Sequence, residues 1–192
     1  MNIRSIMAAG MAACVAVAAF SDSRADETFE YATVGAWQIR VDPTLGATCF
    51  MMAEFVDGSV LRVGHEESVV HVILGNPNWR SIEYGRVYPI ELAMGDREPW
   101  SGDSVGFSFD PPENQAFLRM DIESDFSNDF LTQVMQERFM VVHYAGKEIL
   151  QLSLEGSFRA TLKMAECQRE INKYRPDPFE VAATGQDDPF AH

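Results

Sequence analysis

The alternation of non-polar and polar positions between residues 35 and 154 predicts a sheet of antiparallel strands. Trp37, Ile39 and Val41 are separated by polar residues, which is typical of a strand with one buried face and one face in water. Residues 48–55 are non-polar on both faces and predict a central strand. Further strands are expected between clusters of turn residues, at 60–63, 69–74, 86–94, 105–109, 116–122, 140–144 and 149–154.

Two segments near the end of this region have helical spacing. Behind a polar capping region at 125–129, a short helix is predicted from the non-polar residues Phe130, Leu131, Val134, Met135 and Phe139. A last helix is expected from Gly156 to the residue before Pro176. Its sheet-facing side is predicted to consist of Ala160, Met164, Cys167 and Ile171, widened by Phe158, Leu162 and Ala165.

These patterns together predict a β-rich α+β fold. We expect an antiparallel β sandwich or barrel-like sheet of about eight strands with two short helices, the last of which packs on the sheet. Residues 26–175 are expected to form this single domain. Residues 176–192 are acidic, contain three prolines and a glycine, and lack periodicity, so they predict a disordered tail.

The first 25 residues have the layout of a cleavable secretory signal. Arg4 ends a positive region, residues 6–20 are non-polar, and Ser23-Arg24-Ala25 ends in a small residue. Cleavage there would start the mature chain at Asp26. The non-polar stretch is too short to cross a bilayer, and nothing downstream is long and non-polar enough to span one. The sequence therefore predicts a periplasmic or secreted protein without a transmembrane segment.

Charge narrows the range of partners. The chain has 29 acidic and 15 basic residues among 192, and a formal net charge of −14. Binding to phosphate backbones requires a surplus of lysine and arginine, so nucleic acid and anionic membranes are disfavoured. The cluster of Arg169, Lys173 and Arg175 is typical of a solvated helix end.

Three cysteines support export to an oxidising compartment. Cys14 lies within the signal, which leaves Cys49 and Cys167 as a pair that we predict to be disulfide-bonded. Two alternatives stay open: two free thiols in the core, and a lipid anchor on Cys14 as part of a lipobox.

Candidate catalytic chemistry is sparse. His65, His71 and His143 are not accompanied by cysteine or carboxylate at a recognised zinc spacing, and no G-x-S-x-G or glycine-rich phosphate loop occurs. The acidic run at 121–129 does not match a helical calcium loop. Such a loop needs glycine at its sixth position, where this chain has Phe126, and an acid at its twelfth, where it has Thr132. We therefore expect no catalytic residue, metal or cofactor.

Aromatic residues in predicted loops are the candidate binding residues. Trp79 and Tyr84 flank a loop rich in proline and asparagine, and Trp100 is expected in a loop with glycine, aspartate and proline. Such side chains either form a contact surface or fold back over the end of a β domain.

Short segments at both ends resemble a family of exported proteins. Gly35-Ala36-Trp37-Gln38-Ile39, Cys49-Phe50-Met51-Met52 and the segment at 152–160, LSLEGSFRA, are similar to small alphaproteobacterial proteins of the invasion-associated locus B type. This chain has Ala36 where an acid is usual and lacks a cysteine on the Trp37 strand. The resemblance implies a periplasmic or secreted β-rich accessory protein and transfers no catalytic residue.

Two hypotheses about function follow. The first is a non-enzymatic exported protein that binds a protein partner in the cell envelope or the host; an inhibitor of a basic target is a special case. The second is a periplasmic hydrolase whose site is assembled from distant residues, for which His71 or His143 would have to lie among acids in one pocket. The sequence does not specify the oligomeric state.

Overall fold

The computed structural model describes residues 28–66, 68–107 and 116–174. The predicted signal at 1–25, with Cys14, and the predicted tail at 176–192 lie outside these residues. In chain order the elements are β1 (Phe29–Val34), β2 (Trp37–Asp42), the 3-10 turn η1 (Pro43–Leu45), β3 (Thr48–Glu54), β4 (Val60–Glu66), β5 (Val69–Gly75), β6 (Val87–Ala93), β7 (Trp100–Phe107), β8 (Phe117–Ile122), α1 (Ser124–Gln136), β9 (Phe139–Tyr144), β10 (Lys147–Ser153) and α2 (Ser157–Lys173).

All ten strands belong to one antiparallel sheet in the order β1-β2-β3-β4-β5-β8-β7-β6-β9-β10. The first five strands pair in sequence order, and the chain then skips to β6 and returns through β7 to place β8 beside β5. Tight turns hold the hairpins: Ala145 and Gly146, both at positive φ, connect β9 to β10. Two consecutive residues at positive φ match the twist of the strands that they join.

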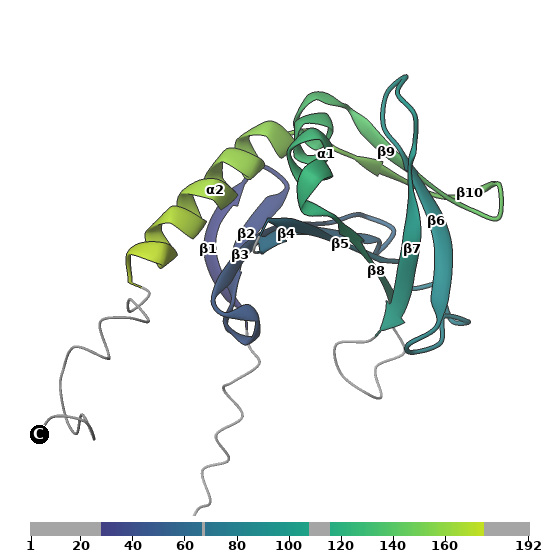
Figure 1. The fold of residues 1–192 in the computed structure, drawn as a ribbon, viewed down its shortest axis with the longest axis horizontal. Coiled ribbons are helices and arrows are strands. Elements are labelled where there is room, and N and C mark those ends of the chain that lie inside the picture. Colours follow the sequence, from purple (N-terminus) through teal and green to yellow (C-terminus); the bar gives the residue numbers. More distant parts are fainter. Residues whose placement is uncertain (1–27, 67, 108–115, 175–192) are drawn as a thin grey trace, which may run out of the picture.

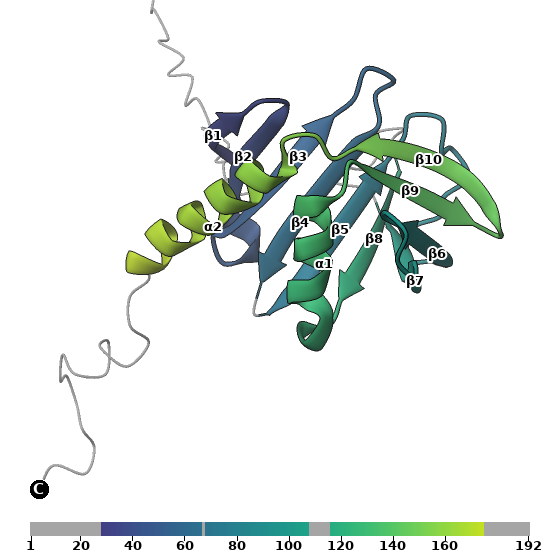
Figure 2. The ribbon, with the colours of Figure 1, turned by 90° about the horizontal axis from the view of Figure 1, so that it is seen from above.

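The sheet is strongly curved. Figure 1 shows an arch in which β4, β5 and β8 form the top, β1–β3 descend on one side and β6 and β7 on the other. Both helices and the β9–β10 hairpin lie above the arch (Figures 1 and 2). We call the sheet surface that carries the helices the helix face and the opposite, concave surface the arch face.

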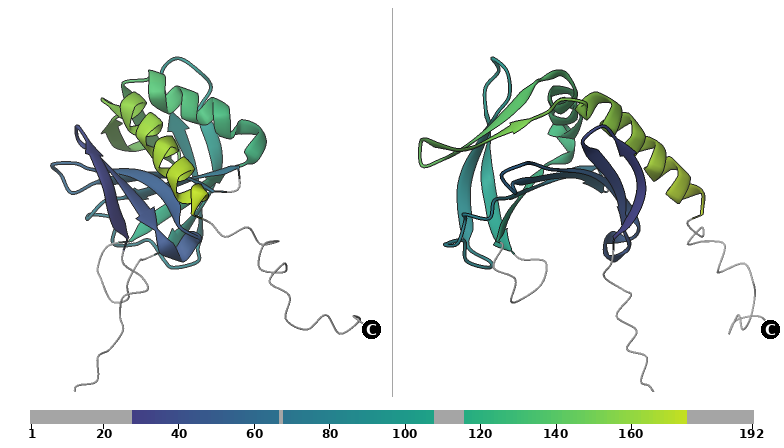
Figure 3. Two further views of the ribbon diagram at one scale, coloured as in Figure 1. Left: turned by 90° about the vertical axis from the view of Figure 1, so that its left-hand side faces the viewer. Right: turned by 180° about the vertical axis from the view of Figure 1, so that it is seen from behind.

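The main core lies on the helix face. Alternate residues of the strands point into it, among them Ile39, Met51, Val63, Val72 and Leu92, all of which are fully buried. α2 crosses β2 and β3, as seen from behind in Figure 3, and α1 lies against β5, β8 and α2. Phe130 and Val134 of α1 and Ala160 of α2 complete this layer.

The predicted β-rich α+β class with the last helix on the sheet is confirmed. The described residues form ten strands where about eight were expected, partly because β1, which has a mixed pattern, was not predicted. The sheet is continuous and curved, as in the barrel-like alternative.

Local predictions needed three corrections. Residues 125–129 form the start of α1, not a cap before it, and Phe139 begins β9 instead of ending the helix. Trp100 is not in a loop, because β7 begins at that residue. Phe158 and Leu162 do not face the sheet: 54% and 53% of their surfaces are exposed, respectively. Of the other residues predicted to face the sheet, Ala160, Met164 and Cys167 are buried, and Ile171 is partly buried against the core.

Candidate functional site

The arch face carries a second set of buried side chains. The strand register places Arg62 on β4, Ile73 on β5 and Arg119 on β8 in one row across the top of the arch. The next row, two residues along, contains Gly64 and His71. Gly64 contributes no side chain to this concave surface, where side chains from neighbouring strands converge.

Gly75 also limits crowding on the arch face. A Cβ atom at Gly75 would lie 2.5 Å from the Phe117 ring, so only glycine allows that ring to lie against β5.

Asp42 and Arg62 form a buried ion pair on this face. Arg62 Nη2 donates to Asp42 Oδ2 at 2.6 Å, and the two side chains are only 10% and 8% exposed. Asp42 also accepts from the Thr44 backbone amide at 3.0 Å and from its hydroxyl. The Arg62 guanidinium lies 3.6 Å from the centre of the Phe50 ring, a cation–π contact.

The pKa values reflect this arrangement. Burial alone would raise the pKa of Asp42, but the hydrogen bonds from Thr44 and Arg62 outweigh it and lower that pKa below its ordinary value. Burial lowers the pKa of Arg62, and the charge of nearby Arg119 lowers it further, against the stabilising effect of Asp42. The two arginines of the row are therefore close enough to repel each other.

A second charged cluster surrounds His71. Its Nδ1 atom lies 2.7 Å from Asp121 Oδ1 and 2.9 Å from Arg119 Nη2, and its Nε2 atom lies 3.5 Å from Glu66. With a proton on Nδ1 the ring donates to Asp121, and without it the ring accepts from Arg119. Arg119 also donates through Nε to Asp121 at 2.8 Å.

Asp121 is kept ionised by its neighbours. Its partial burial would raise the pKa, but the hydrogen bonds from His71 and Arg119 and their positive charge hold the pKa of Asp121 at about 2. By contrast, burial and the charge of His71 lower the pKa of His65, which lies on β4.

A pocket of about 330 Å³ opens on the arch face between these groups. We call it the arch pocket. Strands β4, β5 and β8 contribute one part of its lining, the η1 region a second, and β7 with the loop before β6 a third. Its lining residues are Asp42, Thr44, Leu45, Arg62, Ile73, Tyr84, Val105, Phe107 and Arg119.

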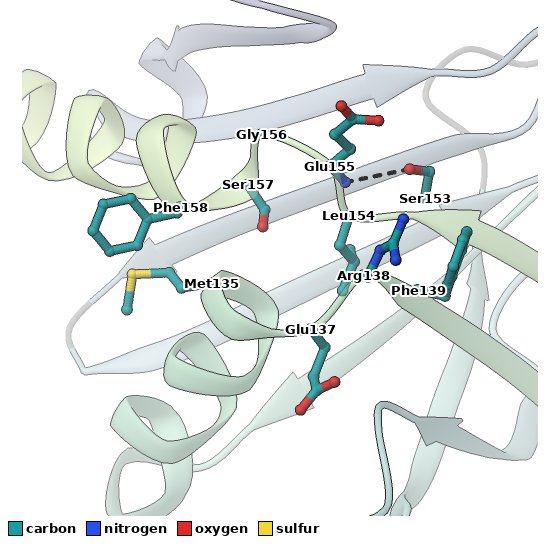
Figure 4. A pocket seen from close by; sticks show the side chains of 10 residues that line it. All are labelled: Met135, Glu137, Arg138, Phe139, Ser153, Leu154, Glu155, Gly156, Ser157 and Phe158. Carbon is teal, nitrogen blue, oxygen red and sulfur yellow. Dashed lines mark hydrogen bonds between the residues drawn. The ribbon is translucent and has the colours of Figure 1, made fainter.

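A second hollow, of about 310 Å³, lies where α1, β9, β10 and α2 meet. In Figure 4, Met135 from α1 and Phe158 from α2 lie on one side of it. Arg138, just before β9, and Phe139, the first residue of β9, lie on the other. Phe139 is 46% exposed. With Leu162, one turn after Phe158, these non-polar residues form an exposed surface that we call the helix-side patch: Met135, Phe139, Phe158 and Leu162.

The three aromatic candidates do not come together. Trp79 is partly buried and packs against the core. Tyr84 is 84% exposed and lines the arch pocket. Trp100 faces α1: its ring contacts Phe130 edge-on with centroids 5.4 Å apart, and its Nε1 donates to Gln133. A binding role for these residues stays a prediction, and Trp100 has a structural contact that accounts for its position.

The predicted disulfide between Cys49 and Cys167 is confirmed. It joins β3 to α2, with the two Cα atoms 6.1 Å apart. The backbone amide of Cys49 also donates to the side chain of Gln168 at 2.8 Å. The last helix is thus fixed to the sheet by a covalent bond and by an adjacent hydrogen bond.

The acidic residues of the run at 121–129 lie at the start of α1 and in the His71 cluster. Glu123 is the N-cap of α1, and Asp125 lies in its first turn. In the described ranges no three His, Cys, Asp or Glu side chains are grouped so as to hold a metal ion. His143 lies opposite Glu91 on β6, and its buried Nδ1 atom has no hydrogen-bond partner among the described residues.

Arg62 and Arg119 were missed by sequence reasoning. Each occupies the third place in a strand whose neighbours are non-polar, VLRV and FLRM, respectively. An arginine within such a segment can be recognised as a sign that the second face of the sheet is also covered. What the sequence does not give is the pairing of β5 with β8, which brings the two residues into one row.

The comparisons with known proteins provide no relative. No family model, characterised protein or solved structure matches the chain. Among the described residues, no helix is long and non-polar enough to cross a membrane.

Proposed function

We propose that this chain is an exported periplasmic or secreted accessory protein that acts by binding a protein of the cell envelope or the host, without catalysis of its own. The helix-side patch carries this proposal. Phe139 and Phe158 line a ready-formed hollow and each expose about half of their surface, and Leu162, one turn after Phe158 on α2, is exposed to a similar extent. Exposed non-polar side chains gathered around a hollow are typical of protein-binding surfaces, where one aromatic or aliphatic side chain of the partner fills the hollow.

The rim of the hollow favours a protein partner. Two acidic residues, Glu137 and Glu155, and one basic residue, Arg138, line the hollow together with its non-polar side chains. A non-polar centre with a rim of mixed charge is the usual anatomy of a protein–protein interface. The disulfide and the hydrogen bond from Trp37 Nε1 to the Glu155 carbonyl, at 2.9 Å, hold the elements around the hollow in place.

A hydrolase is the second candidate, because His71 does lie among acids. Its geometry is less suitable for catalysis. A general base needs one ring nitrogen directed at a nucleophile or water, with the other oriented by an acid. Here both ring nitrogens lie near carboxylates, and within the described residues no hydroxyl or thiol forms a hydrogen bond with the ring.

Affinity capture with matched baits tests the proposal. The mature protein, Phe158→Ser and Phe29→Ser are used as baits against a cell-envelope extract. Phe158 and Phe29 are exposed to 54% and 57%, so the two substitutions are equivalent except in position. We expect a stoichiometric partner with the wild type and with Phe29→Ser, and its loss with Phe158→Ser.

Two results would overturn the proposal. One is capture that is unchanged by Phe158→Ser. The other is a hydrolytic activity on an ester, peptide or peptidoglycan substrate, if this activity co-purifies with the protein and is lost in His71→Asn.

A further inference from the structure

The arch pocket lies on the opposite side of the sheet from the helix-side patch, and the partner protein proposed above leaves it unused. We propose that it is a binding site for a carboxylate attached to a short non-polar body. This ligand chemistry belongs equally to a free aliphatic or aromatic acid and to the C-terminal residue of a peptide. The proposal is independent of the helix-side patch and can fail or succeed without it.

Pocket size and walls fit a small amphipathic ligand. The volume of about 330 Å³ is at the lower end of the range of about 300–1,000 Å³ found for small-molecule sites. Most of its wall is non-polar, from Leu45, Ile73, Val105, Phe107 and the ring of Tyr84. Such walls can bury a hydrocarbon or aromatic group from water.

Polar groups in the pocket favour an anion over a cation. The Asp42 carboxylate is already engaged by the Thr44 amide, the Thr44 hydroxyl and Arg62. Arg119 uses Nε and Nη2 to bind Asp121 and His71, whereas its Nη1 atom has no partner among the described residues. A carboxylate accepts well from a guanidinium that is held in a fixed orientation.

The positions of the two arginines are a second reason to expect a negatively charged ligand. Arg62 and Arg119 are separated by a single strand position, that of Ile73, and both line the pocket. Each guanidinium is held by a carboxylate, Arg62 by Asp42 and Arg119 by Asp121. These partners fix the two guanidinium groups, so that a ligand does not have to order them. A negative charge in the pocket would also offset the burial and the repulsion by Arg119 that together lower the pKa of Arg62.

The test is a titration followed by amide-resonance NMR on the mature protein. The probes are 4-phenylbutyrate, decanoate and a hexapeptide that ends in phenylalanine with a free carboxylate. Their neutral counterparts are 4-phenylbutyramide, decanamide and the same peptide with an amidated end. We expect saturable shifts at Ile73, Tyr84 and Val105 with carboxylates, and at least tenfold weaker binding of the amides. The free acids and the peptide distinguish the two sources of the ligand.

Variants locate the binding. Arg119→Gln removes the charge and is expected to weaken carboxylate binding at least tenfold. Arg97→Gln, at an exposed arginine in the loop after β6, makes the same change of net charge and should leave affinity unchanged. Tyr84→Ala removes one wall of the pocket. Because the Tyr84 side chain is 84% exposed, its removal should not unfold the protein, so this variant tests the pocket even if Arg119→Gln fails to fold.

Three outcomes would overturn the assignment: no saturable shift at the pocket with any carboxylate up to millimolar concentration, equal binding of acids and amides, or an unchanged affinity in Tyr84→Ala. Loss of the captured partner protein in Phe158→Ser has no bearing on these results. The two proposals are therefore distinguishable.

Discussion

Reduction of the Cys49–Cys167 disulfide is expected to lower the stability of the domain by about 3–5 kcal/mol. The bond joins residues 118 positions apart. In the chain-entropy model, closing a loop of this length restricts the unfolded chain by an amount equivalent to about 5 kcal/mol at 25 °C. Residual structure in the unfolded chain reduces this figure. For a domain of this size the melting temperature should fall by about 10 °C.

Differential scanning calorimetry with and without reductant measures this effect, and hydrogen exchange locates it. Amides of α2 should lose protection first, because the bond fixes this helix to β3 while the meander β1–β5 retains its strand pairing. The double variant Cys49→Ala/Cys167→Ala is the control, since its melting temperature should not respond to reductant. The reasoning is refuted if thiol counting shows complete reduction while the wild-type melting temperature stays the same.

The remaining predictions concern two ion pairs of the arch face and two glycines of the sheet. Because the folded pKa of Asp121 is about 2, its ion pair stabilises the fold fully above the unfolded pKa of about 3.9. That contribution disappears as the pH falls through 2. Because the Asp121 side chain is 50% exposed, the ion pair contributes at most about 1 kcal/mol to the free energy of unfolding. Its loss in Asp121→Asn should make the decrease of stability with falling pH shallower. Asp42→Ala removes the carboxylate that contacts the buried Arg62 guanidinium and should lower the free energy of unfolding by about 3 kcal/mol in urea unfolding. Gly106→Ala would place a Cβ 2.3 Å from the Glu83 carbonyl and should destabilise by about 2 kcal/mol or more in the same assay, whereas Gly64→Ala, with its nearest atom at 3.4 Å, should lose less.

Much of the sheet could be predicted because its signals are local. Alternation at Trp37, Ile39 and Val41 places their strand correctly, with Trp37 and Ile39 buried, and turn residues separate the strands that follow. The cysteine pair could also be predicted, since only one pairing remains once the signal is set aside. Strand β1 escaped notice because it is an edge strand with exposed Phe29, Glu30 and Thr33, so that burial does not impose a period on it.

The candidate sites could be predicted only in part, since they depend on contacts that are remote in sequence. Phe158 and Leu162 have the spacing of a buried stripe, yet α2 rests on the sheet through the side that carries Cys167, and the disulfide fixes that orientation. Tyr84 was a candidate on loop chemistry alone, and the curvature of the sheet is what brings it beside Arg119. Periodicity reports which side chains share a face, whereas curvature decides whether that face encloses a volume.

The strand order makes β5 the strand whose second neighbour is added last within this part of the sheet. After β5 the chain must complete β6, β7 and β8 before the last of these pairs with β5. Until then the edge of β5 displays unpaired backbone groups beside Val70, Val72 and Leu74, which are completely buried in the finished fold. An exposed non-polar edge is a template for pairing with another chain. A nascent or proteolysed chain that ends between residues 76 and 116 is therefore the form of this protein most prone to aggregate. Pairing of β8 with β5 covers the exposed edge and ends this tendency.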